Sequence, residues 1–287
     1  FNLVGKAVKF PEHGVVTVSA SYSGYNNGYS RSSSSYYGIN IFSTSVSLGK
    51  HLKWPDDYFS LSNAISYMYY NVNNYQTAIF STGYANSFTY NVSLVRNSTD
   101  ALIYPRSGSE FLLSTQFTPP YSLFSDKDYT SMTAQEKYKW LEYHKWKINV
   151  AYYLNLFDNL VMMVRGKYGF LGKYHPDLDP PFERFYLGGS GLSSSLVLEG
   201  RDNIGMRGYA DDALSPLDAS GNAIGGTIYQ KMTFELRYPV SLNPTATIYL
   251  LTFVEAGNSW LDFKQYQPFT MYRSAGNPPY CRTIRGD

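Results

Sequence analysis

The stretch KWKINVAYYL, residues 145–154, decides the fold of this chain. Every second residue from Trp146 to Leu154 is apolar, whereas Lys145, Lys147 and Asn149 occupy positions between them. Successive side chains of a β-strand point to opposite faces of the sheet, so the pattern predicts a strand with one apolar and one polar face. Such a strand suits the wall of a membrane β-barrel, in which one face meets lipid and the other a lumen.

The same two-residue period recurs along the chain. Apolar residues alternate with Ser and Thr from Val16 to Tyr22, and with Thr, Asn and Ser from Phe88 to Leu94. Similar patterns predict six further strands, nine in all, at about 39–50, 58–70, 110–118, 159–170, 227–238 and 246–256. Helical periodicity is weaker everywhere, and its best candidate, 131–142, lies in a predicted loop.

The predicted connections alternate between short turns and long polar segments. The turns lie at about 53–57, 96–109, 155–159 and 238–244, and the long segments at about 24–38, 71–87, 119–144 and 171–226. Outer-membrane barrels combine short periplasmic turns with longer extracellular loops. Tyr and Trp residues near the predicted strand ends suit the aromatic girdles of such barrels. The sequence therefore favours an all-β transmembrane antiparallel barrel.

Composition separates this fold from its alternative, a soluble β-sandwich or closed soluble barrel. Of 287 residues, 29 are Tyr and 17 are Phe, only 16% are charged, and the formal net charge is +2. The polar faces carry mostly Ser, Thr and Asn, which suits a lumen better than a fully solvated sheet face. A charge this small, without a Lys/Arg-rich run, indicates no nucleic-acid partner. No apolar run is long enough for a transmembrane helix.

The longest predicted loop, 171–226, contains an arginine between small residues. Arg207 stands in the segment IGMRGY, and an arginine set in such a loop among amphipathic strands needs carboxylate partners. Glu235 and Glu255 lie on the two strands that follow, and alternation points Glu235 into the lumen. Because a guanidinium is a planar fork of donors, Arg207 can bridge both carboxylates.

The order of the motifs resembles that of the BamA family of barrel-assembly proteins. The segments that carry the resemblance are PFERFYLGG (181–189), IGMRGY (204–209), GNAIGG (221–226) and TFELRYP (233–239), with SGSEF (107–111) and YRSAG (272–276). The resemblance runs from about Val15 to Gly276. It implies that 171–226 is the sixth extracellular loop, which folds back into the barrel and places its arginine against the inner wall.

The same resemblance implies roles for individual residues. The loop motif would be Met206, Arg207, Gly208 and Tyr209, where Tyr209 replaces a more usual Phe. Its lumen partners would be Glu235 and Glu255, the latter at a position that is usually Asp, and Gly208 would let the loop backbone approach the wall. The loop glycines would be Gly188, Gly189, Gly225 and Gly226. We expect this contact to pin the loop and stabilise the barrel, without proton transfer or bond cleavage.

The resemblance also implies that 1–287 is a single partial barrel domain, about nine strands of the sixteen in that family, with periplasmic domains absent. The segment 277–287 departs from the family. Pro278 and Pro279 cannot donate to a strand ladder, so we expect this tail not to continue the barrel as a native strand, or to pair only as an edge.

The function implied by the resemblance is that of an insertase of the bacterial outer membrane, which folds and inserts β-barrel proteins without ATP. Its partners would be nascent outer-membrane barrels, accessory lipoproteins, and the lipid and lipopolysaccharide of that membrane. One alternative is a related secretion or translocation pore of the same superfamily. Another is a passive outer-membrane channel or a barrel-borne enzyme, although neither a charged constriction loop nor a nucleophile paired with a base is visible.

The sequence indicates no cofactor and no metal site. The four histidines, His13, His51, His144 and His175, share no ligand spacing. The Ser-rich runs lack the Gly-x-Ser-x-Gly elbow of a hydrolase, so we expect no enzymatic activity. The single cysteine, Cys281, has no partner for an internal disulfide.

Overall fold

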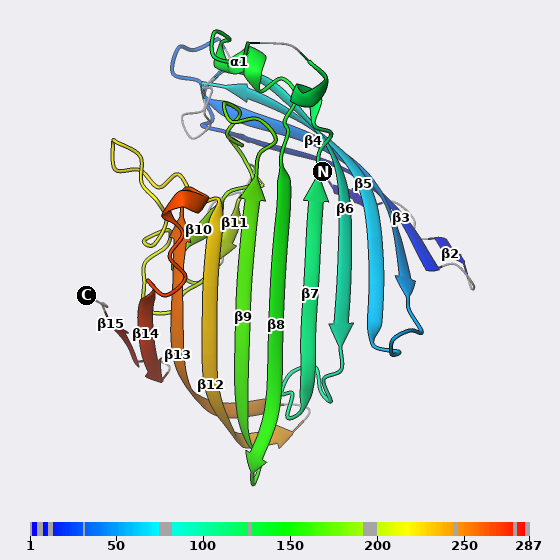
Figure 1. Ribbon diagram of the computed structural model, residues 1–287, viewed down its shortest axis with the longest axis vertical. Helices are drawn as coiled ribbons and strands as arrows, with labels where there is room; N and C mark the ends of the chain where they lie inside the picture. The colour runs from blue at the N-terminus through cyan, green and yellow to red at the C-terminus, as the bar shows by residue number, and fades with distance from the viewer. Residues whose placement is uncertain are drawn as a thin grey trace.

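A computed structural model describes residues 2–4, 8–10, 14–30, 32–74, 82–125, 128–191, 200–243, 246–277 and 280–284. Within these residues the chain forms a 13-stranded antiparallel sheet and a separate two-stranded parallel sheet. Nine long strands make up the body of the large sheet: β3 (Gly14–Asn26), β4 (Gly38–His51), β5 (Phe59–Asn73), β6 (Gly83–Asn97), β7 (Gly108–Phe117), β8 (His144–Phe157), β9 (Leu160–Gly172), β12 (Ile228–Asn243) and β13 (Ala246–Trp260). They correspond to the nine strands predicted from alternation, and Figure 1 shows them as a curved wall.

The long strands pair in chain order, with one interruption. β9 pairs with β12, and the loop 173–227 between them carries the short parallel strands β10 (Phe185–Leu187) and β11 (Asp202–Ile204). Figure 1 shows β10 and β11 behind β9 and β12, on the concave side of the wall. The loop therefore folds inward, as the sequence predicts, and we call residues 173–227 the inner loop.

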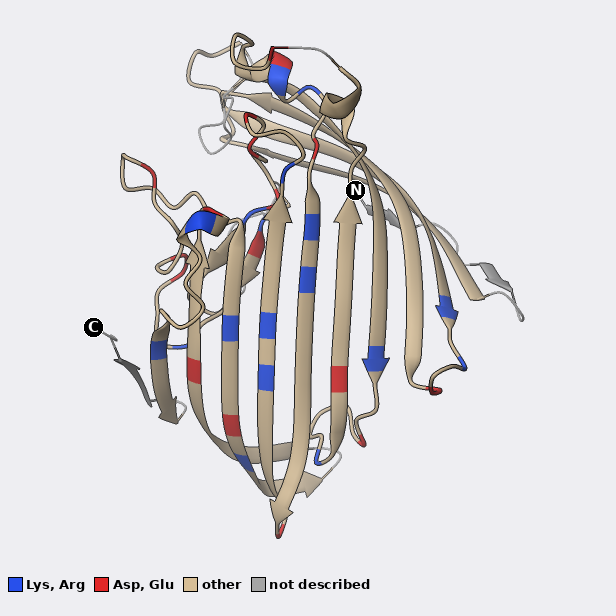
Figure 2. Ribbon diagram, viewed as in Figure 1, with Lys and Arg blue, Asp and Glu red and all other residues tan. Residues whose placement is uncertain are grey.

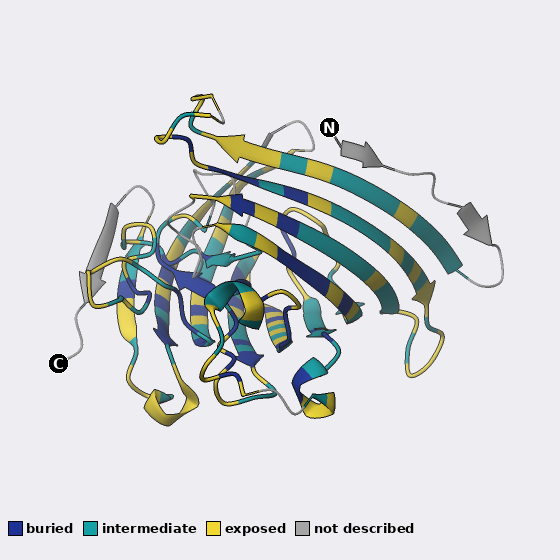
Figure 3. Ribbon diagram, turned by 90° about the horizontal axis from the view of Figure 1, so that it is seen from above, coloured by how far each residue is buried: buried dark blue, intermediate teal, exposed yellow. Residues whose placement is uncertain are grey.

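Successive residues of the long strands alternate between the two faces of the wall (Figure 3). The two-residue period predicts that the apolar side chains of these strands face lipid. Six of eight such residues are exposed, Val18, Phe88, Tyr90, Ile148, Val150 and Phe234, and the other two, Val16 and Leu236, are half-buried. Thr89 and Glu235, predicted for the lumen, are buried on the opposite face. The side chains of β6 and β12 thus face the predicted sides, because a slip by one residue would exchange the two faces.

One predicted boundary is wrong. A turn was expected at 238–244, yet β12 continues to Asn243, and Pro239 lies within it beside a shift of register between Pro239 and Ser241. Such an irregularity accommodates a proline, which cannot donate to the ladder. The segment 131–142, predicted to lie in a loop, does so and contains only the one-turn helix α1 (Ala134–Lys137), which begins with a capping box between Thr133 and Glu136. Among the described residues, no helix is long and apolar enough to cross a membrane.

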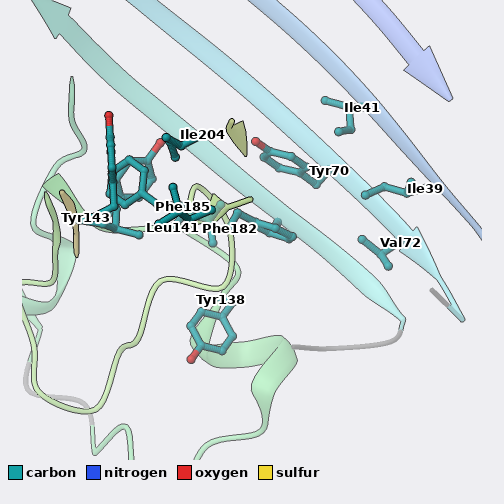
Figure 4. Close-up of a cluster of buried hydrophobic side chains, with 14 of the residues drawn as sticks. Ile39, Ile41, Tyr70, Val72, Tyr138, Leu141, Tyr143, Phe182, Phe185 and Ile204 are labelled. Carbon is teal, nitrogen blue, oxygen red and sulfur yellow. The ribbon is translucent and has the colours of Figure 1, made fainter. Parts of the chain in front are cut away.

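The concave side is filled near the long loops by an apolar cluster (Figure 4). Side chains of the strands, the loop 118–143 and the inner loop meet there, and the Tyr70 and Phe182 rings stack with centroids 4.8 Å apart. Stacked aromatic rings contribute beyond the apolar area that they bury. This packing holds the inner loop against the wall. The buried residues of the cluster include Ile39, Tyr70, Val72, Ala85, Leu141, Tyr143, Phe182, Phe185, Leu187 and Met206.

The ends of the large sheet are short strands. β1 (Asn2–Val4) and β2 (Val8–Phe10) both pair with β3, and β14 (Tyr272–Asn277) pairs with β13. β15 (Tyr280–Ile284) pairs with β14, for example Cys281 with Gly276. Among the described residues β1 and β15 do not pair with each other, so the wall is an open, incomplete barrel.

The expectation that 277–287 forms no strand is therefore wrong for 280–284, while the weighed alternative, an edge strand, agrees with the pairing. A ladder needs only backbone donors and acceptors, so a segment without alternation can still pair along one side. Pro278 and Pro279 lie outside the described residues.

Candidate functional site

Two neighbouring strands place the carboxylates of the candidate site on the concave face. In the register of β12 and β13, Thr233 pairs with Glu255 and Glu235 with Phe253, so the two glutamates are diagonal neighbours. Their side chains are only 7% and 3% exposed. A carboxylate this deeply buried requires compensating charge and hydrogen bonds.

Arg207 of the inner loop supplies that compensation. Its Nη2 lies 2.6 Å from Oε1 of Glu235 and 2.7 Å from Oε1 of Glu255, and its Nε donates to Glu255 Oε1 at 3.0 Å. The Arg207 backbone N–H donates to Glu255 Oε2 at 2.9 Å, and the guanidinium carbon lies 3.8 Å from the centroid of the Phe253 ring. The sequence-predicted contact is present, and both the side chain and the backbone of the loop take part.

Two cations of β12 complete the network. Nζ of Lys231 lies 2.9 Å from Glu255 Oε1 and donates to the Gly205 carbonyl oxygen at 2.6 Å. Nη2 of Arg237 lies 2.7 Å from Glu235 Oε2. Three cations thus surround two carboxylates, and Figure 2 shows charged residues on the neighbouring strands of this wall. The arrangement holds these charges in fixed positions. We call its five residues, Arg207, Lys231, Glu235, Arg237 and Glu255, the clamp.

The other residues of the loop motif fix the backbone around Arg207. The Met206 side chain is fully buried, and its N–H donates to the Gly189 carbonyl oxygen at 2.9 Å. Gly208 has a φ of +88°, a backbone conformation that favours glycine. The motif therefore needs a glycine at this position for its backbone conformation. The Tyr209 hydroxyl donates to the Arg273 carbonyl oxygen of β14 at 2.9 Å.

The predicted loop glycines lie where separate arms of the inner loop meet. Gly188 and Gly189 donate to the carbonyl oxygens of Ile204 and Tyr209, and Gly226 exchanges two backbone hydrogen bonds with Phe185. A Cβ on Gly226 would lie 2.2 Å from Ser259 Oγ, and one on Gly225 would lie 2.6 Å from the Tyr186 ring. These glycines allow close approach between the loop arms and the wall.

A second ionic contact, which the sequence analysis missed, anchors the loop at Glu183 and Asp202. Lys145 of β8 is 2% exposed, and its Nζ lies 2.8 Å from Glu183 and 2.9 Å from Asp202. Lys147 lies 3.2 Å from the same Asp202 carboxylate. Burial raises the pKa of Asp202, but the charges of Lys145 and Lys147 outweigh it and hold that pKa below the usual value for aspartate.

One signal in the sequence could have revealed this second contact. Glu183 is the acidic residue of the motif PFERFYLGG, and in a loop expected to fold against the inner wall it indicates a cation on the lumen face. Lys145 and Lys147 alternate on the lumen face of their strand, as the opening pattern predicts. Among the described residues, no three His, Cys, Asp or Glu side chains are grouped as metal ligands.

The fold and this clamp define a class: a β-barrel wall of the outer-membrane type, with a long loop folded against its inner face. The sequence model of the Omp85 superfamily domain matches residues 11–277, and the chain belongs to this superfamily. Among solved structures it is similar to BamA from Haemophilus ducreyi lacking POTRA domains 1–3, with a TM-score of 0.63 and 17% sequence identity. That likeness covers 95% of this chain and 59% of the other, and it confirms the expected BamA-type fold. A comparison with curated proteins found no match.

Proposed function

We propose that this chain forms part of the barrel wall of an insertase in the bacterial outer membrane. The insertase would assist the folding and insertion of other β-barrel proteins. Its substrates would be unfolded outer-membrane barrels, and its surroundings accessory lipoproteins, lipid and lipopolysaccharide. The activity would be non-enzymatic and would need no cofactor, since the wall would assist folding by non-covalent contact and no covalent bond is made or broken.

The observation that carries this proposal is the clamp of Arg207 on Glu235 and Glu255 within an Omp85 barrel wall. The clamp buries two carboxylates to keep a long loop inside the lumen, and such buried charge needs good geometry to be tolerated. A loop held at Glu183, Asp202 and Arg207 would brace the curved wall from within.

A passive channel fits the concave side less well. The inner loop and the loop 118–143 pack an apolar cluster into it, whereas a water-filled pore requires a polar interior. A secretion pore of the same superfamily is the second candidate, because the match to the Omp85 superfamily domain does not distinguish it from an insertase.

Liposomes that carry the protein provide the test. An unfolded outer-membrane β-barrel is added, and its folding is followed by its shifted mobility in cold SDS electrophoresis. We expect folding to proceed several-fold faster than in empty liposomes, and Arg207→Ala to remove most of this acceleration. The matched control is Arg106→Ala, which removes an arginine from an exposed turn, where its partner Asp100 lies 3.4 Å away.

The same preparation separates the alternatives. A secretion pore would deliver the added protein into the liposome interior, where protease cannot reach it. A passive channel would release small solutes without accelerating folding. Either of these outcomes, with no gain in membrane-inserted barrel, would overturn the proposal.

A further inference from the structure

The turn 98–107, which joins β6 to β7 at the lower end of the wall in Figure 1, carries one tyrosine back onto the wall. Tyr104 is only 4% exposed, although Leu102 and Ile103 just before it are exposed. It packs in a small apolar cluster with side chains of β8, β9 and β13: Ala151, Tyr153, Val161, Met163 and Tyr249. Met163 pairs directly with Glu235 of the clamp, so this cluster lies on the concave face beside it.

The Tyr104 hydroxyl reaches the strand that carries most of the clamp. It lies 3.0 Å from the carbonyl oxygen of Arg237 in β12, and 3.3 Å from that of Asn159 in the turn between β8 and β9. A hydroxyl donates one proton, and the shorter of these contacts is the one to Arg237. Within the described strands, Arg237 is the last residue of β12 that pairs with β9. The hydroxyl therefore holds β12 at the point where its pairing with β9 ends.

The side chain of Arg237 connects this contact to the clamp. Its Nε donates to Glu235 Oε2 at 2.8 Å, and its guanidinium carbon lies 5.6 Å from the centroid of the Tyr153 ring, which belongs to the Tyr104 cluster. This pairing leaves Oε1 of Glu235 to accept a hydrogen bond from Arg207 Nη2, at 2.6 Å. Arg237 thus orients Glu235 so that each carboxylate oxygen has its own cation.

We propose that Tyr104 is a positioning residue of the clamp. It holds the backbone of Arg237 in place and, through the guanidinium of Arg237, the orientation of Glu235 toward Arg207. Hydrogen bonds and packed side chains carry such coupling when they form a continuous chain of contacts. The turn 98–107 and the inner loop, which join the strands at opposite ends of the wall, therefore loosen together. The proposal rests on these contacts and does not depend on the insertase function.

Chymotrypsin cleavage within 200–226 of the detergent-solubilised protein measures release of the inner loop. Tyr104→Phe removes only the hydroxyl, and we expect it to accelerate this cleavage roughly 3- to 10-fold, the effect of losing one hydrogen bond. The matched control is Tyr67→Phe in β5, which removes a tyrosine hydroxyl that donates to Asn86 Oδ1 at 2.7 Å. The control should leave cleavage within 200–226 unchanged.

A double-mutant cycle with Arg237→Met separates positioning from a general loss of stability. If Tyr104 acts through the Arg237 side chain, adding Tyr104→Phe to Arg237→Met should accelerate cleavage by less than about twofold further. The same acceleration by Tyr104→Phe in both backgrounds would overturn the proposal, and so would no acceleration by Tyr104→Phe alone.

The coupling should also act in the opposite direction, because coupling between two sites is reciprocal. A spin label at Leu102→Cys, in a Cys281→Ser background, reports the mobility of the turn 98–107. We expect the label to be more mobile when Arg207→Ala is also present. A label at Asp57→Cys, at an exposed position in the turn between β4 and β5, should not respond. An unchanged spectrum at Leu102→Cys would count against the proposal.

Discussion

Arg207 joins one loop to two strands through a single planar group. It contacts Glu235 and Glu255 at once, and Lys231 and Arg237 keep each glutamate in contact with a second cation. Lysine could not reproduce this geometry, because its ammonium is a compact charge without the fork of donors. At the scale of single residues, the clamp therefore depends on the shape of the cation as much as on its charge.

We expect Arg207→Ala to release the inner loop by about 2–3 kcal/mol, below the ~3–5 kcal/mol for removing one partner of a buried pair, because Lys231 and Arg237 remain. Chymotrypsin should cleave within 200–226 roughly 30- to 150-fold faster. Arg207→Lys should lie between wild type and Arg207→Ala. Arg106→Ala, whose pair is exposed, should change the rate by less than about fivefold. Equal cleavage of wild type and Arg207→Ala would show that the clamp does not hold the loop.

The contact between Arg207 and its glutamates could be predicted because the strand period places Glu235 inward. Lys231 lies on the same face of β12 and could have been added by the same argument. The sequence could indicate that Glu183 needs a cation on the lumen face. It could not choose Lys145 as that cation or add Asp202 to the contact, because both acids lie in an irregular loop without a period to orient them. The Met206 contact to Gly189 also depends on the folded path of that loop.

At the scale of elements, the wall holds the inner loop through two separate ionic contacts. Glu183, just before β10, and Asp202 in β11 meet Lys145, while Arg207 follows β11 by only a few residues. A glycine on the wall leaves room for this packing: a Cβ on Gly169 would lie 2.2 Å from the Tyr229 ring and 2.8 Å from that of Phe185. The surfaces of the loop and the wall are thus complementary where β10 packs against β9 and β12.

The loop should respond to acid through Asp202. Its pKa in the folded state is lowered, so its contribution to stability is present above the ordinary aspartate value of about 4 and is lost as the pH falls through the lowered pKa. A spin label at Ala219→Cys, in a Cys281→Ser background, should show constant mobility from about pH 7 to 5 and greater mobility below about pH 4. Asp202→Asn should be more mobile already at pH 7 and change less with acid. Coincident curves for the two proteins would refute this role.

The long strands were predictable because each has a two-residue period over much of its length. β10 and β11 were not, since three residues are too few to show a period and their pairing joins distant parts of the inner loop. β15 was missed for a related reason, as its sequence does not alternate and only backbone pairing with β14 reveals it. The opposite error occurred at Pro239. The proline was taken to indicate a turn, but the strand continues through it with a shift of register between Pro239 and Ser241.

At the scale of the whole molecule, the exposed apolar side chains lie on the convex face of the wall and the ionic contacts on the concave face. Such an arrangement needs lipid outside, because an exposed apolar surface of this extent is unfavourable in water. It also needs a paired backbone within the membrane, which the long strands provide for one another. The placement of the wall in lipid is thus the claim on which the other conclusions depend.

Quenching of site-specific fluorophores by lipid-borne nitroxides tests this claim most directly. Single cysteines at Tyr90 and Ile148, and at their strand neighbours Thr89 and Asn149, are labelled in a Cys281→Ser background of the liposome-reconstituted protein. Labels at Tyr90 and Ile148 should be strongly quenched and those at Thr89 and Asn149 only weakly, because adjacent residues face opposite sides of the wall. Strong quenching at Thr89 and Asn149 with little at Tyr90 and Ile148, or equal quenching at all four, would contradict the account.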